Sequence, residues 1–267
     1  MKSLSIWGTI IVAAIVSGGS LGFLGTYIVG MRIPFIGVVM SHAAMLGAVL
    51  SILLGLPAFG MALILAFAAS LLLSLMISPR QRLESETHLS ILFSLMMGLV
   101  FLGMGLMRKD MTPLLGILWG SLLFVKPMDL LIMSAPALLL FIFGLAFHKE
   151  LKAILFSRSL ALISGIPVKL MTALVLLLSA GIITANLNIV GGLMLYSLLT
   201  CPAGAAYQVS RNLRNVLILS VIFGIVSAAG GLWTSYVADL PTGACITLFA
   251  VVVYGLAVLV RKYHPVE

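Results

Sequence analysis

The sequence predicts an all-α protein, a polytopic transmembrane helical bundle of about nine spans (eight to ten). Of its 267 residues, 62% are hydrophobic and 8% are charged, whereas a soluble domain carries about 25% charged residues. Apolar runs of about 20 residues, the length that a spanning helix needs, recur along the whole chain. The runs do not alternate between polar and apolar residues as the strands of a membrane β-barrel do, so the class is helical.

The apolar runs are expected to form a single transmembrane domain over 1–267, with spans at 6–29, 33–56, 58–78, 88–107, 127–147, 170–187, 190–208, 215–236 and 242–260. The first run is longer than a signal-peptide core and lacks an obvious cleavage site, so it is interpreted as a retained helix. The apolar stretch 112–125 is short and is expected to form a half-helix or a re-entrant segment.

Basic residues predict the orientation of the chain, because Lys and Arg gather in cytoplasmic loops. The net charge is +8, with 15 Lys and Arg residues in total. Placing the N-terminus outside and the C-terminus in the cytoplasm puts 4 of the 15 outside, at Lys2, Arg108, Lys109 and Lys126. The other 11 then lie inside, at Arg32, Arg80, Arg82, Lys149, Lys152, Arg158, Lys169, Arg211, Arg214, Arg261 and Lys262.

The largest polar connection, 148–169, is cytoplasmic in this orientation. Its centre, 152–164, is expected to form a short helix across the end of the bundle, which Gly165 and Pro167 terminate. Such a feature would suit a transporter that docks a separate driving subunit from the cytoplasm. The alternative is an ordinary interfacial loop.

His42 is the ionisable residue within the otherwise apolar run 33–56. A polar ring at membrane depth is costly, so His42 is a candidate functional residue. The alternative is a histidine that only hydrogen-bonds a neighbouring helix.

Several enzyme and carrier signatures are absent from the sequence. It has no GxxxxGK[ST] nucleotide loop, no HExxH zinc-protease helix and no GxSxG serine elbow. The seven acidic residues lie in loops or at span ends, which weakens a proton-coupled carrier. Cys201 and Cys245 lie in separate runs without a CxxC, so no thiolate metal site is indicated.

Six segments, in order along the chain, resemble the membrane subunit of bacterial and archaeal ABC importers for zinc, manganese and iron(II). They are GVVMSHA at 37–43, ETHLSILF at 86–93, LWGSLLFVKPMDL at 118–130, FSRSLA with the following GIPV at 156–168, IVGGLMLYSLLTCPAGAA at 189–206 and SYVADLPTGACITL at 235–248. Within the last two segments, gating or packing roles are expected for Gly191, Pro202, Asp239 and Pro241.

The resemblance implies a fold related to the vitamin B12-type importer permeases, in a prokaryotic plasma (inner) membrane. Two copies of the permease would enclose a path for a divalent transition metal, which an extracytoplasmic metal-binding protein delivers. A cytoplasmic ABC ATPase dimer would drive alternating access, so this chain would be no enzyme and would bind no cofactor. The alternatives are a secondary transporter or channel for a metal ion and, less favoured, an intramembrane enzyme. The ATPase coupling segment would comprise Phe156, Ser157, Arg158, Ser159, Leu160 and Ala161.

The chain departs from the family pattern around the expected metal contact, His42. The family's aspartate, four residues earlier and therefore on the same helix face, is Val38 here. Loss of this carboxylate weakens a manganese assignment, because imidazole suits zinc, iron, nickel or copper whereas carboxylate suits manganese. Met45 is either a soft ligand beside His42 or a packing residue.

Two further departures concern the cytoplasmic side. Glu86 and His88 stand in the fourth span's opening segment, where they form either an exit site on the translocation path or a solvated helix start. Ser157 and Ser159 replace acidic residues of the family's coupling segment. This predicts either a partner ATPase with a different charge pattern in its groove or a divergent branch of the family with another substrate.

Overall fold

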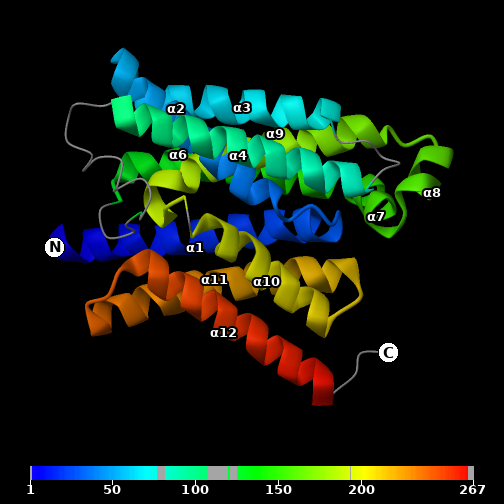
Figure 1. Cartoon of the computed structure of the whole chain (residues 1–267). Coiled ribbons are helices and arrows are strands. Elements are labelled where there is room, and N and C mark those ends of the chain that lie inside the picture. Colours follow the sequence, from blue (N-terminus) through cyan, green and yellow to red (C-terminus); the bar gives the residue numbers. More distant parts are fainter. Residues whose placement is uncertain (1, 77–81, 107–119, 121–124, 193, 264–267) are drawn as a thin grey trace.

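The computed structural model describes residues 2–76, 82–106, 120, 125–192 and 194–263. Eight of the described helices are long and apolar enough to cross a membrane, which confirms a multi-pass, all-helical protein. No strand occurs in these ranges (Figure 1). The helices are α1 (Lys2–Gly30), α2 (Ile36–Leu54), α3 (Ala58–Met76), α4 (Arg82–Leu106), α6 (Pro127–Ala146), α7 (His148–Phe156), α8 (Arg158–Ile163), α9 (Val168–Val190), α10 (Leu195–Val209), α11 (Leu213–Ala238) and α12 (Thr242–Tyr263).

The span expected at 190–208 forms the shorter helix α10, which has 15 residues. Gly191 breaks the helical run, because its φ of 91° belongs to a region that glycine adopts readily and other residues rarely adopt. At about 1.5 Å per residue, α10 covers less than the hydrocarbon thickness of a bilayer. It still returns the chain to the end at which α11 begins (Figure 1).

The segment expected at 112–125 lies mostly outside the described residues. Gly120, which is described, has a φ of 61° and lies directly against the backbone of Val190 and Gly191. A Cβ atom at position 120 would collide with that backbone. Gly120 is therefore in close backbone contact with the turn between α9 and α10.

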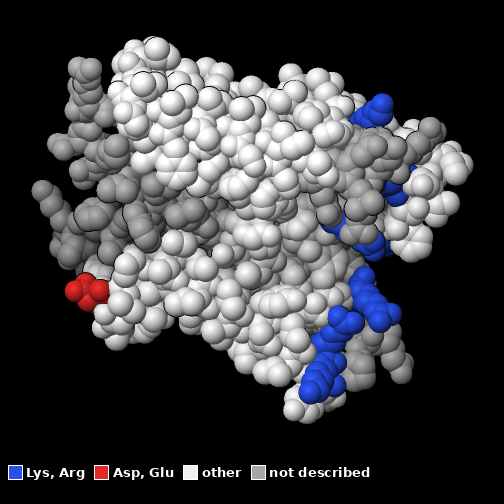
Figure 2. Space-filling view, in the orientation of Figure 1, with Lys and Arg blue, Asp and Glu red and all other residues white. Residues whose placement is uncertain are grey.

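The two ends of the bundle differ in charge. The start of α1 and the end of α12 lie at opposite ends, and α7 and α8 share the end at which α12 finishes (Figure 1). Lys and Arg side chains gather at the α7–α8 end, whereas an acidic side chain marks the other (Figure 2). Among the described residues, Lys126 is an exception to this gathering of basic side chains, because it precedes α6 at the end away from α7.

Helices α1 and α11 pack with their backbones in close contact. A Cβ atom on Gly18 would collide with the carbonyl of Gly224, and one on Gly22 would collide with the carbonyl of Ser220. The Ser220 hydroxyl donates a hydrogen bond of 2.6 Å to the carbonyl oxygen of Gly22. Small residues permit this close approach. Van der Waals contact then stabilises the helix pair in lipid, where no hydrophobic driving force acts between helices.

Helix α2 is the most enclosed of the spans, whereas α4, α6 and α12 expose rows of large apolar side chains. The exposed rows suit lipid or another membrane-embedded surface. The enclosure of α2 places His42 in the interior of the bundle.

Candidate metal contact and coupling segment

His42 lies on α2 with only 4% of its surface exposed. Its Nδ1 atom is 2.8 Å from the carbonyl oxygen of Val38, one turn earlier on the same helix. The ring of Phe93 on α4 packs edge-on against the imidazole, with 4.9 Å between the ring centroids. Phe93 also contacts Phe35 in a T-shaped arrangement. The histidine is thus held on one side by its own backbone and on another by an aromatic pair.

This hydrogen bond fixes which ring nitrogen of His42 is available for a ligand. A carbonyl oxygen can only accept, so Nδ1 must carry the proton that it donates to Val38. In the neutral ring, Nε2 then carries a free lone pair. Histidines that bind metals are commonly oriented in this way, with the other nitrogen donating to a backbone carbonyl or a carboxylate.

The two neighbours expected beside His42 have different surroundings. Val38 is half-buried and contributes its carbonyl to the histidine. Met45 is buried in an apolar cluster with Leu46, Val49 and Val100, which favours a packing role. No group of three or more His, Cys, Asp or Glu side chains that could hold a metal occurs among the described residues. Among the described residues, His42 is therefore not part of a cluster of metal-binding side chains.

Glu86 and His88 lie on the first turns of α4. His88 is half-buried, and its Nδ1 atom has no hydrogen-bond partner among the described residues. The side chain of Glu86 lies outside the described part of the structure. An exit site formed by the two residues stays a prediction.

The expectation of one helix over 152–164 is wrong, because α7 and α8 are separate helices joined at Ser157. The backbone of Ser157 is extended, with φ −159° and ψ 115°, which interrupts the helical hydrogen bonds. Its hydroxyl accepts the backbone N–H of Leu160 at 3.4 Å and so caps α8. Ser157 therefore ends α7 and caps the start of α8.

One side of α7 and α8 is anchored to the bundle. Ile154 and Ala161 are buried in the core. The guanidinium of Arg158 donates to the carbonyl oxygen of Met31, just beyond α1, at 3.5 Å. Burial lowers the pKa of Arg158 from its ordinary value, although an arginine remains charged in proteins. This side chain ties α8 to the end of α1.

The other side of α7 and α8 is apolar and uncovered. Phe156 and Ile163 are 85% and 83% exposed, and both lie outside the membrane-spanning helices. Leu160 is exposed between them, and Ser159 is exposed as well. Exposed apolar side chains that lie together in this way suit contact with another protein or with a membrane.

The four residues expected to gate or pack occupy helix boundaries and one helix interior. Gly191 ends α9, and Pro202 is buried inside α10. Asp239 ends α11 in the left-handed conformation, with φ 52°, and Pro241 precedes α12. These positions are consistent with a packing or turn role for each of the four residues. A gating role stays a prediction.

Sequence reasoning missed a buried polar group on α9. Asn186 is 1% exposed, and its amide donates to the carbonyl of Ile182 at 2.8 Å. Its Oδ1 atom has no partner among the described residues. An asparagine inside the apolar run 170–187 was the available signal, since unpaired polar atoms at membrane depth are costly.

Comparison with known proteins identifies the family. The model of the ABC 3 transport family matches residues 4–261. The manganese transport system membrane protein MntC of Halalkalibacterium halodurans is 29% identical over 245 residues, which cover 92% of this chain and 84% of that protein. The high-affinity zinc uptake system membrane protein ZnuB of Haemophilus influenzae is 26% identical over 239 residues, covering 90% and 91% respectively.

The fold agrees with a solved structure of PsaBC from Streptococcus pneumoniae in complex with a Fab. The TM-score is 0.83 at 25% sequence identity, and the match covers 97% of this chain and 95% of that chain. The resemblance read from the six sequence segments is thereby confirmed. The chain belongs to the ABC 3 transport family and is a membrane-embedded ABC permease, a transport subunit rather than an enzyme.

Proposed function

We propose that this chain is the permease subunit of an ATP-driven importer for a divalent transition metal in a prokaryotic plasma membrane. Two copies would enclose the path, an extracytoplasmic binding protein would deliver the ion, and an ATPase dimer would drive alternating access. The observation that carries the proposal is the uncovered apolar side of α7 and α8, at the basic end of a family transport subunit. The basic end would face the cytoplasm, with the N-terminus outside.

The proposed path contact is the Nε2 atom of His42. Its free lone pair follows from the Nδ1 hydrogen bond to Val38, and a neutral imidazole suits zinc or iron(II). Manganese prefers a carboxylate, and the residue one helical turn before His42 is Val38. The relatives named above serve manganese and zinc systems, and the chemistry of this contact favours zinc over manganese.

The test is ATP-dependent uptake into proteoliposomes that contain the permease, its ATPase and the binding protein. Ile163→Ser removes an apolar contact from α8 and should lower both retention of the ATPase and uptake. Leu240→Ser is the matched control, because Leu240 is also exposed but lies in the turn between α11 and α12 at the other end. Uptake that needs no ATPase and follows an ion gradient would instead establish a secondary transporter.

A further inference from the structure

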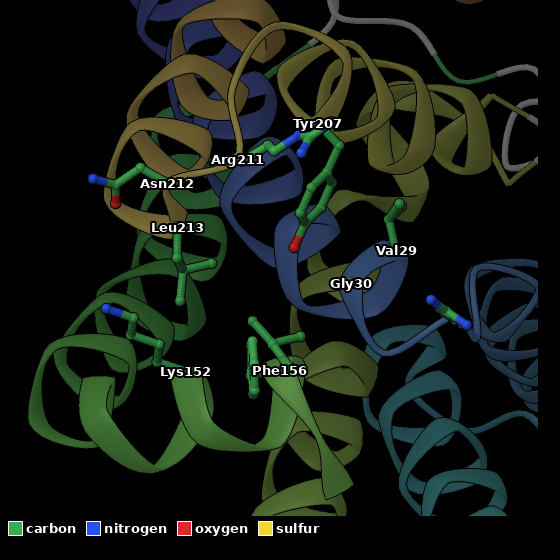
Figure 3. A pocket seen from close by; sticks show the side chains of 10 residues that line it. Val29, Gly30, Lys152, Phe156, Tyr207, Arg211, Asn212 and Leu213 are labelled. Atoms are coloured by element: carbon green, nitrogen blue, oxygen red, sulfur yellow. The ribbon is translucent and has the colours of Figure 1, made fainter. Parts of the chain in front are cut away.

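A cavity of about 540 Å³ opens at the basic end of the bundle, beside the coupling segment. Its walls come from three places that are distant in the sequence: the end of α1, the helix α7 and the connection between α10 and α11 (Figure 3). Arg32, Lys152 and Arg211 each contribute a cationic side chain, one from each wall. The fold thus gathers three positive charges around one cavity.

These charges have no described counter-ion. Arg32, Lys152 and Arg211 form no ion pair or side-chain hydrogen bond with any residue whose side chain the structure describes. Glu150 belongs to α7 but does not line the cavity, and Asp129 and Asp239 lie at the opposite end. Three like charges around a cavity repel one another, so an anion bound there would relieve the repulsion.

The backbone at Arg32 carries a conformational cost. Its φ of 62° lies in the left-handed region, which glycine would adopt more cheaply. The backbone N–H groups of Arg32 and Ile33 donate to the carbonyl oxygens of Val29 and Ile28, so this conformation closes the end of α1 and sets where the Arg32 side chain leaves it. At the opposite wall, α11 begins with its positive dipole end beside Arg211, which adds to the attraction for an anion.

The remaining lining favours an amphipathic ligand over a free ion. Leu155 and Leu213 present apolar surface, and the cavity lies at the end of the spanning helix α1 and the start of the spanning helix α11. The hydroxyl of Tyr207 already donates to the carbonyl of Thr26 at 2.9 Å, so the cationic side chains are the strong donors available. Phosphate next to apolar chain is the chemistry of a lipid headgroup, and basic pockets between helices at the cytoplasmic side suit such headgroups.

We propose that this cavity binds the phosphate headgroup of an anionic phospholipid. The lipid would bridge Arg32 at the end of α1, Lys152 on α7 and Arg211 before α11. It would thereby hold the coupling segment in place against the bundle. This site is independent of the metal that the permease carries.

The experiment measures lipids bound to the purified full-length permease by native mass spectrometry, with phosphatidylglycerol and phosphatidylcholine as probes. Lys152→Gln and Arg211→Gln should each lower phosphatidylglycerol affinity about fivefold, since each cation near a membrane surface contributes about that factor. The lipid preference should disappear in the double variant. Lys152→Arg should retain binding.

Matched controls exist one helical turn away. Lys149 on α7 and Arg214 on α11 are exposed cations that do not line the cavity. Lys149→Gln and Arg214→Gln should leave lipid binding unchanged, and thermal unfolding without added lipid should be equal for all variants. If the control variants lose lipid as strongly as the cavity variants, the attraction is diffuse and the proposal fails.

Two other outcomes would overturn the proposal. If inorganic phosphate displaces phosphatidylglycerol at an affinity equal to that of the lipid, the cavity binds a free phosphate. If the cavity variants keep their lipid but lose the ATPase, the cavity is a protein docking site. Because Ile163 does not line the cavity, the coupling test above and this lipid test can fail separately.

Discussion

The helix pairs α1–α11 and α2–α4 are packed in different ways. In the first pair, glycines bring the backbones into contact, and the Ser220 hydroxyl bridges to Gly22. In the second pair, side chains fill the interface: Phe93 packs against His42, and a methionine-containing cluster surrounds Val100.

This difference in packing suggests a different role for each helix pair. A backbone contact has no rotamers to adjust, so α1–α11 acts as a fixed frame. Aromatic rings and thioethers can repack as helices shift, which suits the pair that carries the proposed metal contact. The following changes test this contrast, from the largest expected effect to the smallest.

Gly224→Leu should cause the largest loss of stability, about 3 kcal/mol or more, because a side chain there collides with the backbone of Gly18. Thermal unfolding in detergent, with size-exclusion profiles, measures it. Gly98→Leu on α4 is the matched control, since nothing lies within 4 Å of a Cβ atom at that position. Equal losses in the two variants would refute the fixed-frame role of α1–α11.

His42→Ala should lower metal uptake by about tenfold or more while the protein stays folded, because it removes the Nε2 ligand. Uptake into proteoliposomes measures the rate, and co-purified ATPase shows that docking is intact. Met45→Leu is the control, since Met45 packs in an apolar cluster and leucine keeps its volume. An unchanged uptake rate in His42→Ala would contradict a direct role.

Val38→Asp should shift selectivity toward manganese by about tenfold, because it places a hard oxygen ligand one turn from His42. Competition between zinc and manganese during uptake measures the shift. Val38→Asn has nearly the same shape without the charge and should give little change. An accessibility map that places position 38 against lipid would also contradict the prediction.

Ser220→Ala should have the smallest effect, a loss of about 1 kcal/mol, because it removes one hydrogen bond to Gly22 but keeps the close packing. Thermal unfolding detects it. Ser74→Ala should be nearly neutral, since the Ser74 hydroxyl is exposed and bonds only within its own helix. A loss for Ser220→Ala as large as that for Gly224→Leu would mean that the hydrogen bond, rather than the backbone contact, stabilises the pair.

The local properties of the chain determined the helices and the family. Apolar length alone located the spans, because a bilayer requires about 20 apolar residues for each crossing. This criterion overestimated the length of α10, because hydropathy does not show where the backbone departs from helical geometry at Gly191. The segment motifs identified the permease family, which the match over residues 4–261 confirms.

Only the tertiary structure decided which residues meet. His42 was visible as an isolated polar residue, but its partner Phe93 and the orientation of its ring depend on how α2 and α4 pack. Arg32, Lys152 and Arg211 are unremarkable loop cations in the sequence, and helix packing brings them around one cavity. The physical reason is that hydropathy and charge act along the chain, whereas close packing and ligand geometry depend on contacts between distant segments.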